Sequence, residues 1–452
     1  MAARTRTLDC SDNDDRISKT PALSRRDFLL AASAAAAAST LVGCAAGDRR
    51  QTGPAIRPGG VQPDKIRVGV IGCGGRGTGA AIDCVKSSAN VEITALGDLF
   101  KERVDSCRAE IEKLGEASKA TEATCFAGFD AYKQVLASPV DLVILAAPPG
   151  FRPPHYAAAI DAGKHVFMEK PVAVDPAGIR TVLAASQVAV AKRLAVVAGT
   201  QRRHQPSYLE AMERIHDGAI GDIVAAQCYW NQEGLWVKKQ ESNWSDMEWQ
   251  CRNWLYFTWL SGDHIVEQHV HNLDVVNWAF GGVPTKCMGM GGRQWRTAAE
   301  YGNVFDHFAI DYEYAGGARV ISMCRQIDKT SVRIGERIVG TRGVCKFDGS
   351  NAEIVGKKNW KFDDGGKPVN PYVQEHADLI DSIRSGKPLN EGKQVAESTM
   401  TAIMGRMSAY TGRELQWDWA MNASKLDLTP EKMEFGPLPV GEPAMPGVTA
   451  LV

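Results

Sequence analysis

The stretch EQHVHNLDVV, residues 267–276, places two histidines and two carboxylates close together in a chain that holds only nine histidines. Glu267 and His271 lie four residues apart, a spacing that puts both side chains on one face of a helix. His264 extends the same stripe, and imidazoles with a carboxylate are ligands that zinc or manganese accepts. Imidazole also titrates near neutral pH and suits acid–base catalysis. The spacing is compatible with three interpretations: a metal site, a catalytic pair and the polar side of a helix.

Two residues close to this pair have less specific patterns. His269 falls on roughly the opposite side of the helix, where a packed or exposed residue is commoner than a ligand. Asp274 continues the polar face by another turn and suits either substrate binding or helix packing. We keep Asp274 among the substrate candidates.

Residues 243–264 are dense in tryptophan, and flat aromatic faces suit sugar rings, although packing in a core is their commoner fate. Of the paired arginines at 202 and 203, one is expected to reach substrate and the other solvent. The tryptophans are Trp244, Trp249, Trp254 and Trp259, and the predicted substrate contacts are Arg202, Arg252, Asn253 and Asp274.

A glycine-rich turn follows the short β-branched run KIRVGVIG and opens a predicted helix. In this context G-x-G-x-x-G is typical of a dinucleotide site, because the glycines permit a tight turn, close approach of a pyrophosphate and close helix packing. Asp98 ends the next predicted strand, where a carboxylate accepts ribose hydroxyls and repels a 2′-phosphate. NAD is therefore favoured over NADP. The predicted loop contacts are Gly72, Gly74, Gly75, Arg76 and Gly77.

Strands and helices alternate over residues 65–200, which predicts an α/β Rossmann domain with a doubly wound parallel sheet. Segments with alternating polarity then predict an α+β domain over 201–420 with a large, mainly antiparallel open sheet, followed by a tail at 421–452. The formal net charge of −1 over 452 residues provides no overall positive electrostatic field that would attract nucleic acid. A small molecule is the expected partner.

The N-terminus reads as an export signal. Paired arginines in SRRDFLL, residues 24–30, precede an apolar run too short to span a bilayer comfortably, which resembles a twin-arginine signal. LVGC, ending at Cys44, resembles a lipobox and predicts lipidation of that cysteine, with ordinary cleavage near Ala45 or Ala46 as the alternative. Residues 1–44 are then a signal peptide and 45–64 a linker. The expected location is periplasmic, reached through the twin-arginine machinery, with a possible lipid anchor.

AGKHVFMEKPVAVD, residues 162–175, resembles the Gfo/Idh/MocA family, which includes glucose-fructose oxidoreductase and inositol 2-dehydrogenase. The Glu-Lys-Pro tripeptide is its most specific mark, and AAPPGFRPPHY and GTQRRHQPSY extend the similarity over about 65–420. The resemblance implies cofactor contacts from Pro148, His155, Glu169 and Lys170, and a catalytic role for Lys170.

The family's D-x-x-x-H pattern matches Glu267 and His271, which implies that His271 is the acid or base and that Glu267 orients it. The chain departs from this pattern in two places: glutamate replaces aspartate, and His269 replaces a small residue.

These features together predict NAD-dependent hydride transfer at a secondary alcohol of a sugar or cyclic polyol. Free NAD is scarce outside the cytoplasm, so a tightly held nicotinamide is expected. One alternative is an NAD-dependent glycoside hydrolase that acts by transient oxidation and elimination. Another, from a different class, is a non-catalytic sugar-binding lipoprotein. The antiparallel sheet is expected to present a broad face, and because relatives often oligomerise through theirs, the resemblance implies a homo-oligomer.

Overall fold

The computed structural model describes residues 64–452. The predicted signal peptide, the lipidation of Cys44 and nearly all of the linker fall outside the described residues. Within 64–452, no helix is both long and apolar enough to cross a bilayer.

The first sheet has six strands, all parallel, in the order β3-β2-β1-β4-β5-β6. This confirms the predicted doubly wound sheet. Strand order reverses beside β1, and in such sheets ligands bind at the carboxyl ends next to that point. The strands are β1 (Ile66–Ile71), β2 (Val91–Asp98), β3 (Cys125–Ala127), β4 (Leu142–Leu145), β5 (His165–Met168) and β6 (Val196–Ala198).

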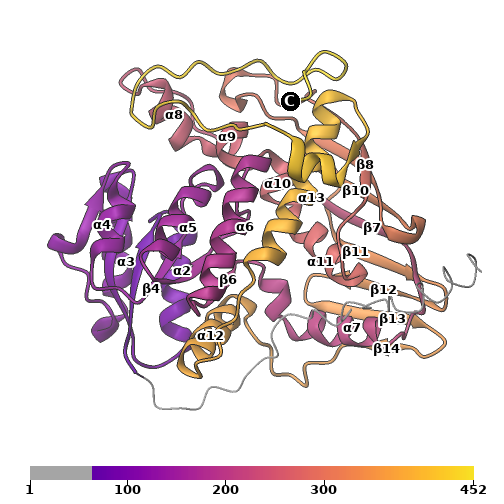
Figure 1. Cartoon of the computed structure of the whole chain (residues 1–452), viewed down its shortest axis with the longest axis horizontal. Helices are drawn as coiled ribbons and strands as arrows, with labels where there is room; N and C mark the ends of the chain where they lie inside the picture. The colour runs from indigo at the N-terminus through magenta and orange to yellow at the C-terminus, as the bar shows by residue number, and fades with distance from the viewer. Residues whose placement is uncertain (1–63) are drawn as a thin grey trace, which may run out of the picture. The chain divides into compact units, whose positions relative to one another are not determined.

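Helices cover both faces of this sheet (Figure 1). One face carries α2 (Gly75–Ser87), α3 (Lys101–Glu112) and α12 (Pro371–Arg384), and the other α4 (Ala131–Ala137), α5 (Arg152–Asp161) and α6 (Pro176–Ala191). The sequence places α12 in the second domain, yet Leu379 and Ile380 are fully buried in the core that α2 and α3 form with the first sheet. The chain therefore returns to its first layer after completing most of its second.

The second sheet has nine strands in the order β14-β13-β12-β11-β7-β10-β9-β8-β15. Only the β7–β10 pair is parallel, which confirms a mainly antiparallel sheet. Its strands are β7 (Ile223–Gln232), β8 (Lys286–Gly292), β9 (His307–Glu313), β10 (Arg319–Gln326), β11 (Arg333–Gly340), β12 (Gly343–Asp348), β13 (Asn351–Gly356), β14 (Trp360–Lys361) and β15 (Leu415–Gln416).

One face of the second sheet is covered by helices and the other is open. The covering helices are α7 (Pro206–His216), α10 (His264–Glu267), α11 (Val270–Phe280) and α13 (Gly392–Thr411), with α8 (Asp246–Arg252) and α9 (Thr258–Ser261) at one end. In Figure 1, α13 lies between α6 and the second sheet, and the C-terminal segment runs past α8 and α9. Helix α13 thus packs against both layers and holds the carboxyl ends of the first sheet beside α10 and α11.

Candidate active site

A cavity of about 560 Å³ lies where the carboxyl ends of the first sheet meet α10, α11 and β7. It gathers the glycine turn, the Glu-Lys-Pro segment and the histidine motif, which are far apart in the sequence. The predicted residues that line it are Gly72, Gly74, Gly75, Arg76, Asp98, Pro148, Glu169, Lys170, Glu267 and His271.

The glycines of the turn divide into two that the fold requires and two that leave space. A Cβ on Gly77 would lie 1.8 Å from the Gly72 carbonyl oxygen, and one on Gly72, whose φ is +98°, would lie 2.2 Å from the Ala147 nitrogen. A Cβ on Gly74 or Gly75 would meet nothing within 4 Å. The open side of the turn therefore faces the cavity at the N-terminus of α2, where backbone N–H groups and the helix dipole suit a phosphate.

Asp98 is held firmly at the end of β2. Its carboxylate accepts hydrogen bonds from the backbone nitrogens of Cys73 at 2.7 Å and Phe100 at 2.9 Å. Burial raises its pKa. The side chain lines the large cavity, at the place where a Rossmann carboxylate meets an adenosine ribose.

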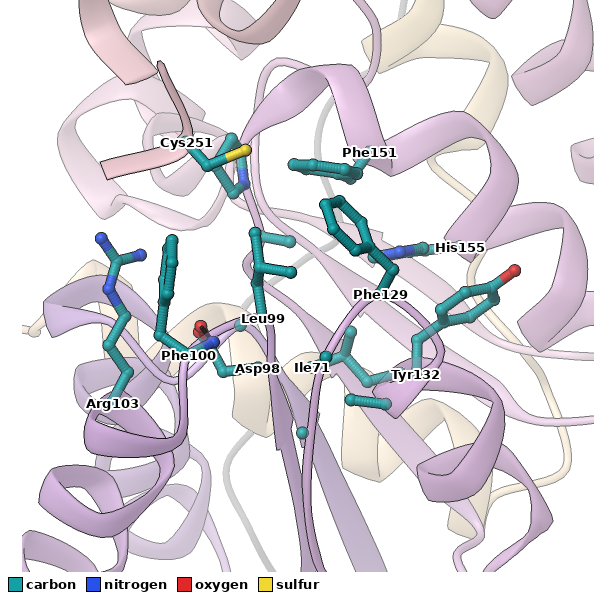
Figure 2. A pocket seen from close by; sticks show the side chains of 16 residues that line it. Ile71, Asp98, Leu99, Phe100, Arg103, Phe129, Tyr132, Phe151, His155 and Cys251 are labelled. Carbon is teal, nitrogen blue, oxygen red and sulfur yellow. Dashed lines mark hydrogen bonds between the residues drawn. The ribbon is translucent and has the colours of Figure 1, made fainter. Parts of the chain in front are cut away.

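A smaller apolar cavity of about 50 Å³ continues from Asp98 (Figure 2). His155 stacks there on Tyr132, with ring centroids 4.3 Å apart, and on Phe151 at 5.9 Å. Burial lowers the pKa of His155 to about 3, so its ring is a neutral part of the wall. Flat apolar walls beside a ribose-binding carboxylate fit an adenine ring. Together with the open glycine turn, Asp98 and this apolar wall offer the kinds of group that the adenosine diphosphate half of NAD requires.

Lys170 is joined to Glu267 across the cavity. Its Nζ donates to the Glu267 backbone oxygen at 2.6 Å and to Oε1 at 3.2 Å. Glu267 Oε2 is buried and has no partner among the described residues.

This arrangement differs from the sequence prediction, in which Glu267 and His271 share one helical face and contact each other. Helix α10 ends at Glu267 and α11 begins only at Val270, so two helices meet here. Glu267 consequently contacts Lys170, and within residues 64–452 no hydrogen bond joins it to His271.

His271 is 7% exposed and stacks on Trp230, with ring centroids 5.5 Å apart and planes 21° from parallel. Burial, with the nearby charges of Lys170 and Arg202, lowers its pKa well below the ordinary value. The imidazole is therefore neutral at physiological pH and can accept a proton. It stands beside the Lys170–Glu267 pair in the same cavity.

A second group of charges ties the glycine turn to the Glu-Lys-Pro segment. Arg76 Nε lies 2.8 Å from Glu169 Oε1. Arg152, only 1% exposed, donates to the backbone oxygens of Glu169 at 3.0 Å and Ala147 at 2.7 Å, while its Nη1 has no partner among the described residues. Burial lowers the Arg152 pKa to about 10. These contacts fix the backbone from which Lys170 projects.

Several residues that line the cavity were not predicted from the sequence. Arg152 is the first residue of α5, in the segment AAPPGFRPPHY that follows β4, and its place in that segment was the available sequence signal. Trp230 and Trp236 lie outside the tryptophan-rich segment, and nothing local distinguishes them. The cavity residues missed are Arg103, Arg152, Gln201, Trp230, Trp236, Gln268 and Tyr372.

The four predicted substrate residues lie outside the cavity lining. Asp274 is 1% exposed, receives both Nε and Nη2 of Arg203, and accepts from Ser398 Oγ at 2.7 Å. Its carboxylate is therefore used to pack α11, and Arg203 is buried with it instead of reaching solvent. Arg202 pairs with Glu336 and lies behind Trp230, with its guanidinium carbon 5.7 Å from the ring centroid.

The other two predicted substrate residues also make contacts within the protein. Arg252 on α8 forms ion pairs with Glu102 and Glu248. Asn253 is fully buried, accepts from the Lys238 nitrogen and donates to the Glu300 oxygen. Both are held by the loops beside α8. A polar side chain near an aromatic-rich segment was too weak a signal to distinguish a substrate contact from a loop anchor.

The predicted aromatic platform is present only in part. Trp254 lines the cavity, whereas Trp244, Trp249 and Trp259 pack around Phe100, Phe151 and Phe257. The cavity's aromatic wall is therefore formed by Trp230, Trp236 and Trp254.

The three residues considered as metal ligands do not converge. His264 Nε2 lies 3.1 Å from the Trp230 backbone oxygen, on the strand side of α10. Within the described part of the chain, no group of three or more His, Cys, Asp or Glu side chains is placed to hold a metal ion. His269 is fully buried and its Nε2 lies 2.7 Å from Ser322 Oγ, so of the two predicted positions, packed or exposed, it takes the packed one.

Comparison with known proteins matches both domains to family models. A model of an oxidoreductase family with an NAD-binding Rossmann fold, GFO_IDH_MocA, matches residues 66–198, and a model of the GFO/IDH/MocA C-terminal domain matches 208–346. Inositol 2-dehydrogenase 4 of Saccharopolyspora erythraea is 33% identical over 36% of this chain. A glycosyl hydrolase family 109 protein of Solibacter usitatus is 34% identical over 33% of this chain.

The matched regions span 45% and 33% of these two relatives, so less than half of each is compared. A solved levoglucosan dehydrogenase, in complex with NADH and levoglucosan, has a TM-score of 0.63 at 16% identity and covers 78% of this chain and 99% of its own. That likeness concerns the fold alone. The two family models follow one another along both domains and include the glycine turn, Lys170 and His271, and the chain therefore belongs to the Gfo/Idh/MocA family of NAD-binding oxidoreductases.

Proposed function

We propose that this protein oxidises or reduces a secondary alcohol of a sugar or cyclic polyol with NAD. The observation that carries the proposal is the cavity of about 560 Å³ in which the glycine turn and Asp98 lie together with Lys170, Glu267 and His271. A site for the nucleotide and a set of proton-transfer groups thus share one space.

Different residues fit the pyrophosphate and the adenosine of the cofactor. Gly74 and Gly75 leave room for the pyrophosphate, and Asp98 with the small apolar cavity would hold the adenosine. A bound nicotinamide would supply the hydride acceptor or donor at the Lys170 end of the cavity.

The chain's own groups would manage the hydroxyl proton. Neutral His271 would accept it as the alcohol is oxidised, and stacking on Trp230 fixes the plane of its ring. The Lys170 ammonium would stabilise the developing negative charge on the same oxygen. Glu267, through its contacts with Nζ, would position Lys170, which is a different task from orienting His271.

A sugar or polyol is supported by the lining of the cavity. Trp230, Trp236 and Trp254 offer flat faces, and Gln201, Gln268 and Glu267 offer groups for hydroxyls. An inositol 2-dehydrogenase relative and a levoglucosan dehydrogenase with a similar fold point to the same class of compound.

The test is a panel of aldoses, glycosides and inositols mixed with NAD and the protein, with NADH formation followed by absorbance. We expect turnover with at least one member, and a fall of about 10²-fold or more in Lys170→Ala. Full activity in Lys170→Ala would remove the proposed role of that residue, and no NADH with any compound would oppose net oxidation.

A second candidate is glycoside hydrolysis through transient oxidation and elimination, supported by the match to a glycosyl hydrolase family 109 protein. The same lysine and histidine would serve it, because the reaction also begins at an alcohol. It predicts release of a free sugar from a glycoside with no net NADH. Chromatography of the products beside the absorbance assay separates the two reactions.

We further propose that the protein is exported with its cofactor already bound, because twin-arginine export accepts folded proteins and NAD is scarce outside the cytoplasm. The RR pair at 25 and 26 and the motif ending at Cys44 support this view. Mass spectrometry of the exported chain would identify the mature N-terminus, and a start other than lipid-modified Cys44 would argue against the anchor. Denaturing protein purified without added nucleotide should release NAD or NADH in nearly equimolar amount.

Homo-oligomerisation is proposed through the open face of the second sheet. Met290 on β8 and Met323 on β10 both pair with Ala309 on β9, so all three share that face. The two methionines are 72% and 41% exposed. A second copy would cover this apolar row. Replacing both with lysine should lower the mass measured by light scattering, whereas Met445→Lys, on the C-terminal segment, should not.

A further inference from the structure

A separate cavity, of about 220 Å³, lies between α13 and the C-terminal segment. It shares no lining residue with the cavity that holds Lys170 and His271. Its walls are mostly apolar, from Met407 on α13 and from Leu426, Leu428 and Ala444 in the C-terminal segment.

The cavity contains a buried cation that lacks an ion pair. Arg406 is 1% exposed and its Nη1 donates to the Gly262 backbone oxygen at 3.0 Å. Among residues 64–452, no carboxylate lies within ion-pair distance of its guanidinium, and burial lowers its pKa. The guanidinium carbon also lies 5.8 Å from the Tyr410 ring centroid, but a buried cation without a counter-ion is costly, so a bound anion would be favoured here.

The acidic groups nearest to Arg406 already accept hydrogen bonds from other donors. Asp263 accepts from the backbone nitrogens of His264 and Phe305 and from the Tyr410 hydroxyl. Asp175 accepts from the nitrogens of Gly178 and Leu428. These two carboxylates reduce the net charge around Arg406 without meeting its guanidinium.

Other polar groups in the lining fit the same kind of ligand. Thr258 and Asn303 lie at the inner wall and are linked by a 3.1 Å hydrogen bond between their side chains. Two further acidic groups belong to the lining, the Glu442 side chain and the terminal carboxyl group of Val452; both residues are exposed, and Val452 accepts a hydrogen bond from Ser424 Oγ at 2.7 Å. The buried part of the cavity therefore carries one positive charge against apolar walls.

We propose that this cavity binds a small organic carboxylate, with its carboxyl group on Arg406 and its apolar body against Met407 and Leu428. The planar guanidinium matches the two oxygens of a carboxylate. The apolar walls favour an organic acid over inorganic phosphate, which would leave them in contact with water.

The test is isothermal titration calorimetry of the full 452-residue chain with butyrate, benzoate and inorganic phosphate. We expect saturable binding of at least one of the two carboxylates and weaker binding of phosphate. Arg406→Gln should weaken carboxylate binding by about tenfold or more. Because that change could also disturb Gly262, Ala450→Trp provides an independent test: Ala450 is exposed in the cavity wall, and the indole would fill the space while Arg406 is retained.

The matched control is Ala137→Trp at the exposed end of α4, which should bind as the unaltered chain does. Carboxylate binding that persists in Ala450→Trp would place the ligand elsewhere and overturn the proposal. So would the absence of saturable binding, or phosphate binding tighter than both carboxylates.

Discussion

At the scale of single residues, burial sets the roles of the charged groups in the cavity. His271 is neutral because little water reaches it and because Lys170 and Arg202 lie near. Lys170 in turn is joined to Glu267, whose second oxygen has no partner among the described residues. A neutral imidazole and Lys170 Nζ therefore line one cavity, and under the proposed function the imidazole would take the hydroxyl proton.

Because His271 and Lys170 have different proposed roles, His271→Ala tests the proton acceptor alone. The change removes the proton acceptor but no residue of the glycine turn, so turnover should fall by about 10²–10⁴-fold. Nucleotide affinity, measured by calorimetry, should stay within about twofold of the unaltered protein, because His271 lies on α11, apart from the adenosine diphosphate contacts. Unchanged turnover would transfer the base role to another group, of which Glu267 is the nearest candidate.

At the scale of elements, the break between α10 and α11 and the start of α2 build the site. The end of α10 places Glu267 at Lys170, whereas α11 carries His271 against β7. A spacing of four residues predicts a shared helical face only where one helix continues, and here Gln268 and His269 interrupt it.

The glycines around the start of α2 allow packing and binding to be separated experimentally. Gly75→Ala places a methyl group in open space at the cavity, so folding should persist while NAD affinity falls about tenfold or more. Gly77→Ala meets the Gly72 oxygen and should lower the free energy of unfolding by about 1–3 kcal/mol.

Gly79→Ala, on the same helix with only Arg76 Nη1 nearby at 3.9 Å, is the matched control. It should bind NAD normally and raise the free energy of unfolding by about 0.5–1 kcal/mol. Urea unfolding and calorimetry measure both quantities. Equal NAD binding in Gly75→Ala and Gly79→Ala would contradict the proposed position of the pyrophosphate.

At the scale of the whole molecule, the sequence alone predicted those site residues whose positions are determined by a local pattern. The glycine turn, Asp98 and Lys170 each follow a short buried strand, and the parallel order of such strands brings their ends together. Trp230 and Asp274 required the second sheet and its covering helices: the first faces the cavity from β7, and the second is buried against α13 by Ser398. Pairings over such distances along the chain leave no local signal.

The whole molecule's stability should depend on pH through its buried histidines. Burial lowers the pKa of His155 and His269 to about 3, and those of His264, His271 and His376 well below their usual value. These rings are neutral when folded but take up protons in the unfolded chain below its histidine pKa of about 6.5. The free energy of unfolding is therefore not reduced by these rings above about pH 6.5, and it falls as the pH drops from about 6.5 toward 3.

His204 acts in the opposite direction. It lies between Asp378, at 2.7 Å, and Glu391, at 3.3 Å, and these carboxylates raise its pKa to about 10. Its contribution is therefore fully present below the unfolded pKa of about 6.5 and is lost as pH rises through about 10.

The two effects together predict maximal stability near neutral pH. Urea unfolding at a series of pH values should show the free energy of unfolding falling on the acid side, by up to about 1.4 kcal/mol per pH unit for each neutral histidine. His155→Phe keeps the stacking on Tyr132 and removes one proton site, so it should flatten the acid limb, whereas His204→Gln should lower stability near neutrality and flatten the alkaline limb. An acid limb identical in His155→Phe would mean that this ring is already protonated in the folded protein, and the neutral apolar wall assigned to the adenine cavity would then have to be abandoned.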